Sequence, residues 1–125
     1  MRYFTLEEVL ELHYMLIEDY SGSHGVHSEQ RLQSLVDAPK LVVFGVEQYK
    51  TPYEKAGVYM RNCIVDHVFV DGNKRTGVTL GVMFLQRCGG VMQASPRELE
   101  YFAVRVATER LSVDEIAAWL ERFTK

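Results

Sequence analysis

The sequence predicts an all-α protein, a compact bundle of about six helices with one short β-hairpin. A Ser or Thr stands three residues before a Glu at four places, and each pair forms a capping box that satisfies free N–H groups at a helix start. Apolar residues at helical spacing follow each pair. Residues 41–49 alone break the pattern, because they are β-branched and aromatic. The four pairs are Thr5–Glu8, Thr51–Glu54, Ser95–Glu98 and Ser112–Glu115.

We expect helices near residues 5–20, 28–37, 52–67, 73–88, 96–110 and 113–123. Pro52 and Pro96 follow their capping residues at the favoured first helical position. Gly89 and Gly90 end the fourth helix, where a left-handed residue is easiest for glycine. The first helix places an apolar face on Leu6, Val9, Leu10, His13 and Leu16.

The fourth helix is expected at the centre of the core, because residues 77–85 are apolar nearly all round. His13 lies on an apolar face and is more simply a satisfied core histidine than a catalytic one. Aromatic residues at helical spacing near the C-terminus are most simply core residues too. They are Tyr101, Phe102, Trp119 and Phe123.

Residues 41–49 have two interpretations. The segment Leu41-Val42-Val43-Phe44-Gly45-Val46-Glu47-Gln48-Tyr49 is compatible with a short hairpin between the second and third helices. An exposed strand edge there would accept an extended peptide by strand addition. The other interpretation is an apolar loop that covers the core.

Chain length and net charge limit the classes of protein to which this sequence can belong. The 125 residues fit one domain, residues 1–125, and the net charge of −3 gives no broad footprint for nucleic acid. No apolar run has the roughly 18 residues of a membrane span. Glu7 and Glu8 stand where a signal peptide would be apolar, so we expect a cytoplasmic protein. Cys63 and Cys88 are expected to be buried, reduced thiols.

The most informative segment is His67-Val68-Phe69-Val70-Asp71-Gly72-Asn73-Lys74-Arg75-Thr76-Gly77, which runs into the fourth helix. Free N–H groups at the start of that helix, together with the helix dipole, form an anion site. Gly72 allows close approach of a phosphate, and Asn73 offers an amide donor. Lys74 and Arg75 add positive charge.

Two further residues of this segment suit phosphate chemistry. Asp71 is a candidate Mg²⁺ ligand, since Mg²⁺ is commonly held by one or two carboxylates and by substrate phosphates. His67 is a candidate general base near neutral pH. Phe69 is expected to fix the loop to the core. The alternative is that the segment has only a structural role, as a helix–loop–helix turn whose charged side chains are solvated. A P-loop is excluded by spacing.

The same segment resembles the signature of the Fic/Doc family. The family pattern His-x-Phe-x-Asp/Glu-Gly-Asn-Gly/Lys-Arg is matched in place by residues 67–75. Lys74 and Val78 stand where Fic proteins usually have Gly and a second Arg, so the chain looks Doc-like. Residues 22–26, 32–39 and 84–90 are also similar to Doc-like chains, and the resemblance covers most of residues 1–92. Val68, His27-Ser28, Arg31 and Gln33 depart from the usual pattern.

The resemblance implies a Fic/Doc-like bundle that uses ATP and Mg²⁺. It implies transfer of the γ-phosphate to a Ser or Thr hydroxyl of a protein, with a translation factor such as elongation factor Tu as the target. His67 would be the base, Asp71 would hold Mg²⁺, and Gly72, Asn73, Lys74 and Arg75 would bind phosphate. Residues 41–49 fall at the position of the family's flap, which docks the target.

Regulation follows from a missing motif. Self-inhibiting Fic proteins carry Ser/Thr-x-x-x-Glu-Gly/Asn, and no Glu here precedes Gly or Asn. We therefore expect inhibition in trans by an antitoxin. Three alternatives remain: a Fic-type AMP transferase, a catalytically degenerate nucleotide-binding module, and, less compatible with the acidic balance, a helix-turn-helix DNA-binding protein.

Overall fold

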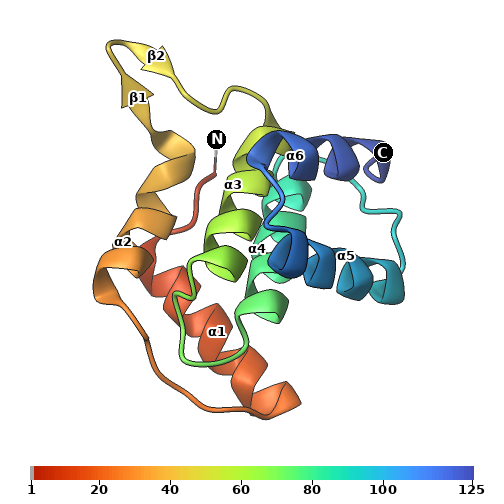
Figure 1. Cartoon of the computed structure of the whole chain (residues 1–125). Coiled ribbons are helices and arrows are strands. Elements are labelled where there is room, and N and C mark those ends of the chain that lie inside the picture. Colours follow the sequence, from red (N-terminus) through yellow and green to blue (C-terminus); the bar gives the residue numbers. More distant parts are fainter. Residues whose placement is uncertain (1) are drawn as a thin grey trace.

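The computed structural model, which describes residues 2–125, is a bundle of six helices, as the sequence predicts. The helices pack in two flanking groups around a central pair (Figure 1). Their bounds are α1 Leu6–Tyr20, α2 Glu29–Asp37, α3 Pro52–Val65, α4 Asn73–Arg87, α5 Pro96–Glu109 and α6 Val113–Arg122, with a 3-10 turn at Ala38–Lys40. None of the described helices is long and apolar enough to cross a membrane.

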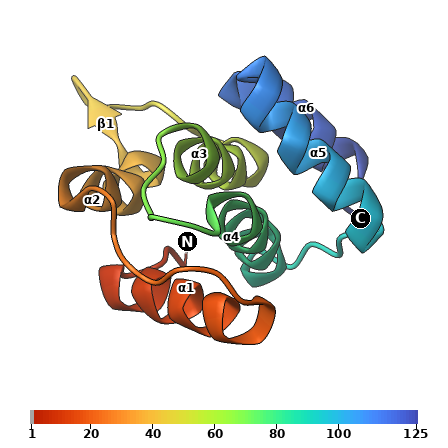
Figure 2. The same cartoon turned by 60° about the horizontal axis from the view of Figure 1, so that its bottom comes forward.

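The central pair is α3 and α4, with α1 and α2 on one side and α5 and α6 on the other (Figure 2). Gly77 permits the close contact of the pair, because a Cβ there would lie 2.8 Å from Cγ1 of Ile64 and 3.0 Å from the carbonyl oxygen of Met60. Leu80 and Phe84 of α4 are fully buried in the same core. The central position of the fourth helix is therefore confirmed.

Each of the four predicted capping residues accepts a hydrogen bond at the start of its helix. Reciprocal capping boxes form at Thr5, Ser95 and Ser112. The Thr51 hydroxyl accepts from the Glu54 N–H, but no return bond from the Glu54 side chain is present. Ser28 caps α2. Within residues 2–125, α4 is thus the one α-helix whose N-terminus has no capping side chain.

The hairpin interpretation of residues 41–49 is confirmed. Strands β1 (Val42–Val43) and β2 (Val46–Glu47) pair antiparallel, with Val42 opposite Glu47 and Val43 opposite Val46. The hairpin projects from the bundle between α2 and α3 (Figure 1). Both strands are exposed, so this segment does not cover the core. We call residues 41–49 the flap.

Three predictions about burial are wrong. Leu10 and Tyr101 are exposed, because Val9 and Phe102 beside them face the core and consecutive helical residues point about 100° apart. The buried face of α1 is Val9, His13 and Ile17. Cys63 is buried, but Cys88, the C-cap residue of α4, is exposed.

Candidate active site

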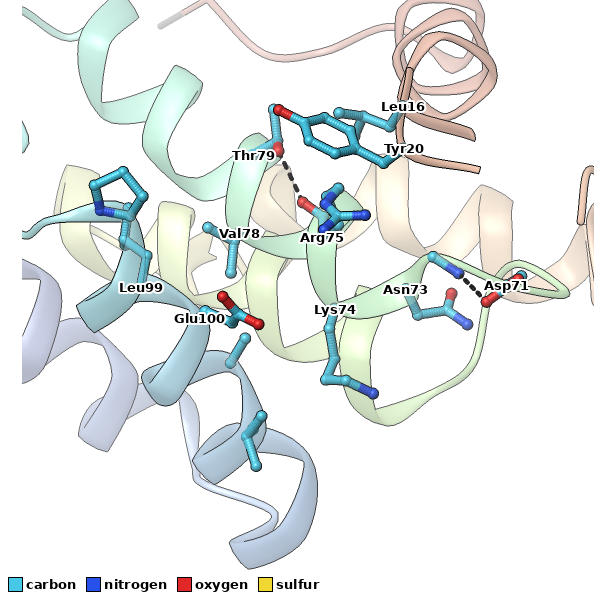
Figure 3. Close-up of a pocket in the computed structure, with 14 residues that line it drawn as sticks. Leu16, Tyr20, Asp71, Asn73, Lys74, Arg75, Val78, Thr79, Leu99 and Glu100 are labelled. Carbon is cyan, nitrogen blue, oxygen red and sulfur yellow. Dashed lines mark hydrogen bonds between the residues drawn. The ribbon is translucent and has the colours of Figure 1, made fainter. Parts of the chain in front are cut away.

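The N-terminus of α4 opens into a cleft of about 540 Å³ (Figure 3). Gly72 is the N-cap in a left-handed conformation (φ 75°), and its carbonyl accepts the first helical bond, from the Thr76 N–H at 2.9 Å. The N–H groups of the first helical turn, residues 73–75, therefore have no capping side chain. They and the helix dipole make this end of the cleft a site for an anion.

The structure brings five of the six predicted site residues to this cleft, and residues from α1 and α5 complete its walls. The predicted residues are Asp71, Gly72, Asn73, Lys74 and Arg75. Leu16 and Tyr20 of α1 and Leu99, Glu100 and Val104 of α5 are among the others (Figure 3). The sequence did not indicate these residues, because their approach to α4 is set by helix packing.

The Asp71 carboxylate is held by two backbone donors. Oδ1 accepts from the Gly72 N–H at 2.8 Å, and Oδ2 accepts from the Ser23 N–H at 3.0 Å. These bonds, led by the one from Ser23, hold the pKa of Asp71 below its usual value. A Cβ on Gly22 would lie 2.8 Å from Oδ2, so the loop approaches closely only because residue 22 is glycine.

Asp71 has the chemistry of a Mg²⁺ ligand. It is exposed and carries its charge at neutral pH, and each oxygen retains acceptor capacity beyond its one backbone bond. Within residues 2–125 no cluster of three or more His, Cys, Asp or Glu side chains is arranged to hold a metal. One carboxylate together with substrate phosphates is a set that Mg²⁺ accepts.

The side-chain amide of Asn73 forms its hydrogen bonds with the loop that carries the signature. Its Oδ1 accepts from the Phe69 N–H at 2.9 Å, and its Nδ2 donates to the Phe69 carbonyl at 2.8 Å. One Nδ2 hydrogen remains beyond these bonds. Phe69 is buried, as predicted, so Asn73 ties the start of α4 to a residue fixed in the core.

The two cations point in different directions (Figure 3). Arg75 places its guanidinium over the ring of Tyr20, 4.0 Å from the ring centroid, and so links α4 to the end of α1. Lys74 is exposed and leaves the helix on another side of the cleft. Glu100 of α5 adds one carboxylate to a cleft wall that is otherwise largely apolar.

His67 lies two residues beyond the end of α3, not within the helix as expected, and it is exposed outside the cleft lining. Its backbone is left-handed (φ 50°), which is uncommon for a residue other than glycine. Its Nδ1 lies 3.3 Å from the Ile64 carbonyl oxygen. Because a carbonyl only accepts, this contact places a proton on Nδ1, and in the neutral imidazole Nε2 then carries the lone pair.

Neighbouring segments clamp the loop between His67 and Asp71. The N–H groups of His27 and Val70 donate to Val68 and Gly25 carbonyls at 2.9 and 3.0 Å, and Val26 forms a β-bridge with Phe69. At the end of α3, the Arg31 guanidinium donates a hydrogen bond to the Asp66 carbonyl at 2.9 Å. These contacts hold the chain between His67 and the anion site.

Comparison with known proteins finds relatives that match most of the chain. The chain is 31% identical over 122 residues to "Protein kinase doc" of Escherichia phage P1, covering 98% of this chain and 95% of the relative. It is 32% identical over 107 residues to "Toxin Doc" of Mycolicibacterium smegmatis, covering 83% and 82%. The profile described as the Fic/DOC family matches residues 3–85, which include the whole signature. The chain belongs to the Fic/Doc family.

Proposed function

We propose that this protein is a Doc-like toxin that transfers the γ-phosphate of ATP to a Ser or Thr hydroxyl of a target protein. The observation that carries the proposal is the uncapped N-terminus of α4, which opens into the cleft beside a charged Asp71. The name of the phage P1 relative supports phosphate transfer, and the name of the mycobacterial relative supports a toxin role.

Each site residue has a role in this proposal. The N–H groups at the start of α4, Lys74 and Arg75 bind and neutralise the phosphates, and Gly72 and Asn73 shape the cradle. Asp71 would hold Mg²⁺, which supplies positive charge that stabilises the transferring group. His67 Nε2 takes the proton of the target hydroxyl, whose oxygen bonds to the γ-phosphorus as the bond to the bridging oxygen of ADP breaks.

The exposure of His67 fits a protein substrate. A hydroxyl on another folded protein can reach a base only if that base lies at the surface. His67 is exposed at the start of the loop that leads to Asp71. The exposed flap offers a strand edge where an extended segment of the target would dock. A translation factor such as elongation factor Tu is the target that the family resemblance favours, with loss of translation as the consequence.

The test is a transfer assay with Mg²⁺ and ATP labelled at the α or the γ position, with a cell extract or purified elongation factor Tu as acceptor. We expect a γ-labelled protein with the native chain and its loss, by at least about 10²-fold, with His67→Ala. His27→Ala is the matched control, since His27 is exposed and its bond to the signature loop comes from its backbone N–H, which alanine keeps.

The other outcomes decide between the alternatives. An α-labelled protein lost in His67→Ala would show AMP transfer, which means that Lys74 and Val78 do not set the orientation of the nucleotide. Nucleotide binding without transfer to any protein would show a degenerate binding module. Equal labelling by the native chain and His67→Ala would remove His67 from the mechanism.

We further propose that an antitoxin inhibits this protein in trans. The relative named a toxin supports it, and so does the absence from the sequence of the self-inhibiting motif. A short protein encoded beside this gene is the first candidate. Its addition to the transfer assay is expected to abolish labelling, whereas undiminished labelling by a stably bound complex would contradict the proposal.

A further inference from the structure

His13, in the middle of α1, makes two directional contacts with the signature. Its side chain is buried, and Nε2 lies 2.8 Å from the backbone oxygen of Asp71. Because that oxygen only accepts, Nε2 carries the hydrogen and donates it. The imidazole also stacks on the Phe69 ring, with the centroids 3.8 Å apart and the planes 6° from parallel. One side chain thus contacts both the fixed end and the charged end of the loop.

These contacts matter because Asp71 is otherwise placed at the surface beside a flexible residue. Gly72 follows it in a left-handed conformation that favours glycine. The carboxylate is held by Ser23 and Gly72, but those bonds fix the side chain and not the carbonyl. The bond from His13 fixes the orientation of the peptide that joins Asp71 to Gly72.

The close approach of α1 at this point supports the same conclusion. A Cβ on Gly72 would lie 3.0 Å from Cδ1 of Ile17 and 3.8 Å from Nε2 of His13. Ile17 is one helical turn beyond His13, and both are buried. The helix therefore rests directly against the peptide that begins the anion site.

We propose that His13 is a positioning residue, which holds the Asp71 carboxylate and the first N–H groups of α4 in one arrangement for Mg²⁺ and phosphate. The inference rests on the proposed function and adds a residue outside the signature to its machinery. A buried histidine that was satisfied for stability alone would need an acceptor but would have no effect on metal-dependent binding.

Two substitutions separate the hydrogen bond from the ring packing. His13→Phe keeps a flat ring for the stack on Phe69 and removes the donor. His13→Gln removes the ring and keeps an N–H donor at a similar reach. Val9→Ala is the control, because Val9 is buried on the same face of α1 one turn earlier and would loosen the helix without touching Asp71.

The measurement is the affinity for ATP by calorimetry, with and without Mg²⁺. Supporting partners of metal ligands are commonly worth about 10- to 100-fold in metal affinity. We therefore expect His13→Phe to lose about 10-fold or more of the affinity that Mg²⁺ adds. His13→Gln should recover most of it. Val9→Ala should stay within about twofold of the native chain, whatever its loss of stability.

A second readout is independent of nucleotide. Hydrogen exchange at the Ser23 and Gly72 amides, which donate to Asp71, should be faster in His13→Phe and unchanged in Val9→Ala. Native affinity and native exchange in His13→Phe would overturn the inference. If the native chain bound no ATP, the proposed function and the role of His13 in it would both fail. Native binding with an unaffected variant would overturn the role of His13 alone.

Discussion

The Asp71 carboxylate is held by backbone N–H groups of Ser23 and Gly72 rather than by a cation close enough to pair with it. Among residues 2–125 no Lys, Arg or His side chain forms an ion pair with this carboxylate, so its charge is balanced only by hydrogen bonds. The neighbouring Asn73 is satisfied by the backbone of Phe69. At this scale the signature contains residues that build the loop beside residues that face the cleft.

Replacing Asp71 by Asn should lower stability in a pH-dependent way. The folded pKa of Asp71 lies below its ordinary value of 3.8, chiefly through the Ser23 N–H. A lowered pKa stabilises the folded state above the unfolded pKa, and the stabilisation is lost as pH falls through the folded pKa. The difference in free energy of unfolding between the native chain and Asp71→Asn should be constant from pH 7 to about 5.

That difference should then shrink below the ordinary aspartate value, as measured by urea unfolding between pH 7 and 2.5. Glu8 and Glu115 also have lowered pKa values, but they titrate equally in both proteins and cancel in the comparison. A gap that stayed constant to pH 2.5 would show that the bonds to Asp71 do not favour its charged form.

At the scale of elements, the flap is joined to the bundle by a buried lysine. Lys55 of α3 is 1% exposed, and its Nζ donates to the carbonyls of Pro39 and Tyr49 and to the Glu47 carboxylate. Tyr49 is the last residue of the flap, and Pro39 lies two residues before its start. A short two-stranded hairpin is marginal alone, so these contacts supply the fixation that its own strands lack.

Lys55→Met should loosen the flap while leaving the helices folded. Methionine fills much of the same volume but leaves the carbonyls of Pro39 and Tyr49 without their charged donor, and bonds to charged groups are worth about 1.5–3 kcal/mol. We expect exchange of the Gln48 amide, which donates to Leu41, to quicken by about 10-fold or more.

Mass-spectrometric hydrogen exchange over residues 39–50 would measure the change. Lys50→Met is the matched control, because Lys50 is an exposed lysine of the same segment. Unchanged exchange in Lys55→Met would mean that the hairpin is stable without the bonds from Lys55. Equally faster exchange in both variants would mean that the loss of one positive charge, and not the loss of those bonds, causes the effect.

At the scale of the whole molecule, the α3–α4 contact carries the site. The loop with His67 follows α3, and the anion site begins α4, so the separation of these two helices sets the distance between His67 and the start of α4. Gly77 lies in the contact between them, against Ile64 and the Met60 carbonyl.

Gly77→Ala should therefore destabilise the protein, by about 1–3 kcal/mol as for other overpacked cores, despite the better helix propensity of alanine. Urea unfolding measures the change, with Gln86→Ala, at an exposed position of the same helix, as the control. The transfer activity of Gly77→Ala should also fall, since the added methyl group separates the elements that hold the two halves of the site. A neutral or stabilising effect would show that the helices adjust without cost.

The helices and the segment that begins α4 could be predicted from the amino-acid sequence, which left the flap as one of two interpretations of residues 41–49. Capping residues and apolar spacing are local, so Thr5, Ser95 and Ser112 could be read without knowing what the helices pack against. Signature residues that lie within nine positions of one another are also brought together by the chain itself.

Which distant residues support that segment depends on how the helices pack. His13 and Ser23 reach Asp71 across 58 and 48 residues of sequence, and Lys55 reaches the flap from inside a helix. Local pattern gave His13 an apolar face but no acceptor, and it placed Leu10, Tyr101 and Cys88 in a core from which they are excluded. The physical reason is that periodicity specifies one face of a helix, whereas the rotation and approach of packed helices choose the residues that meet.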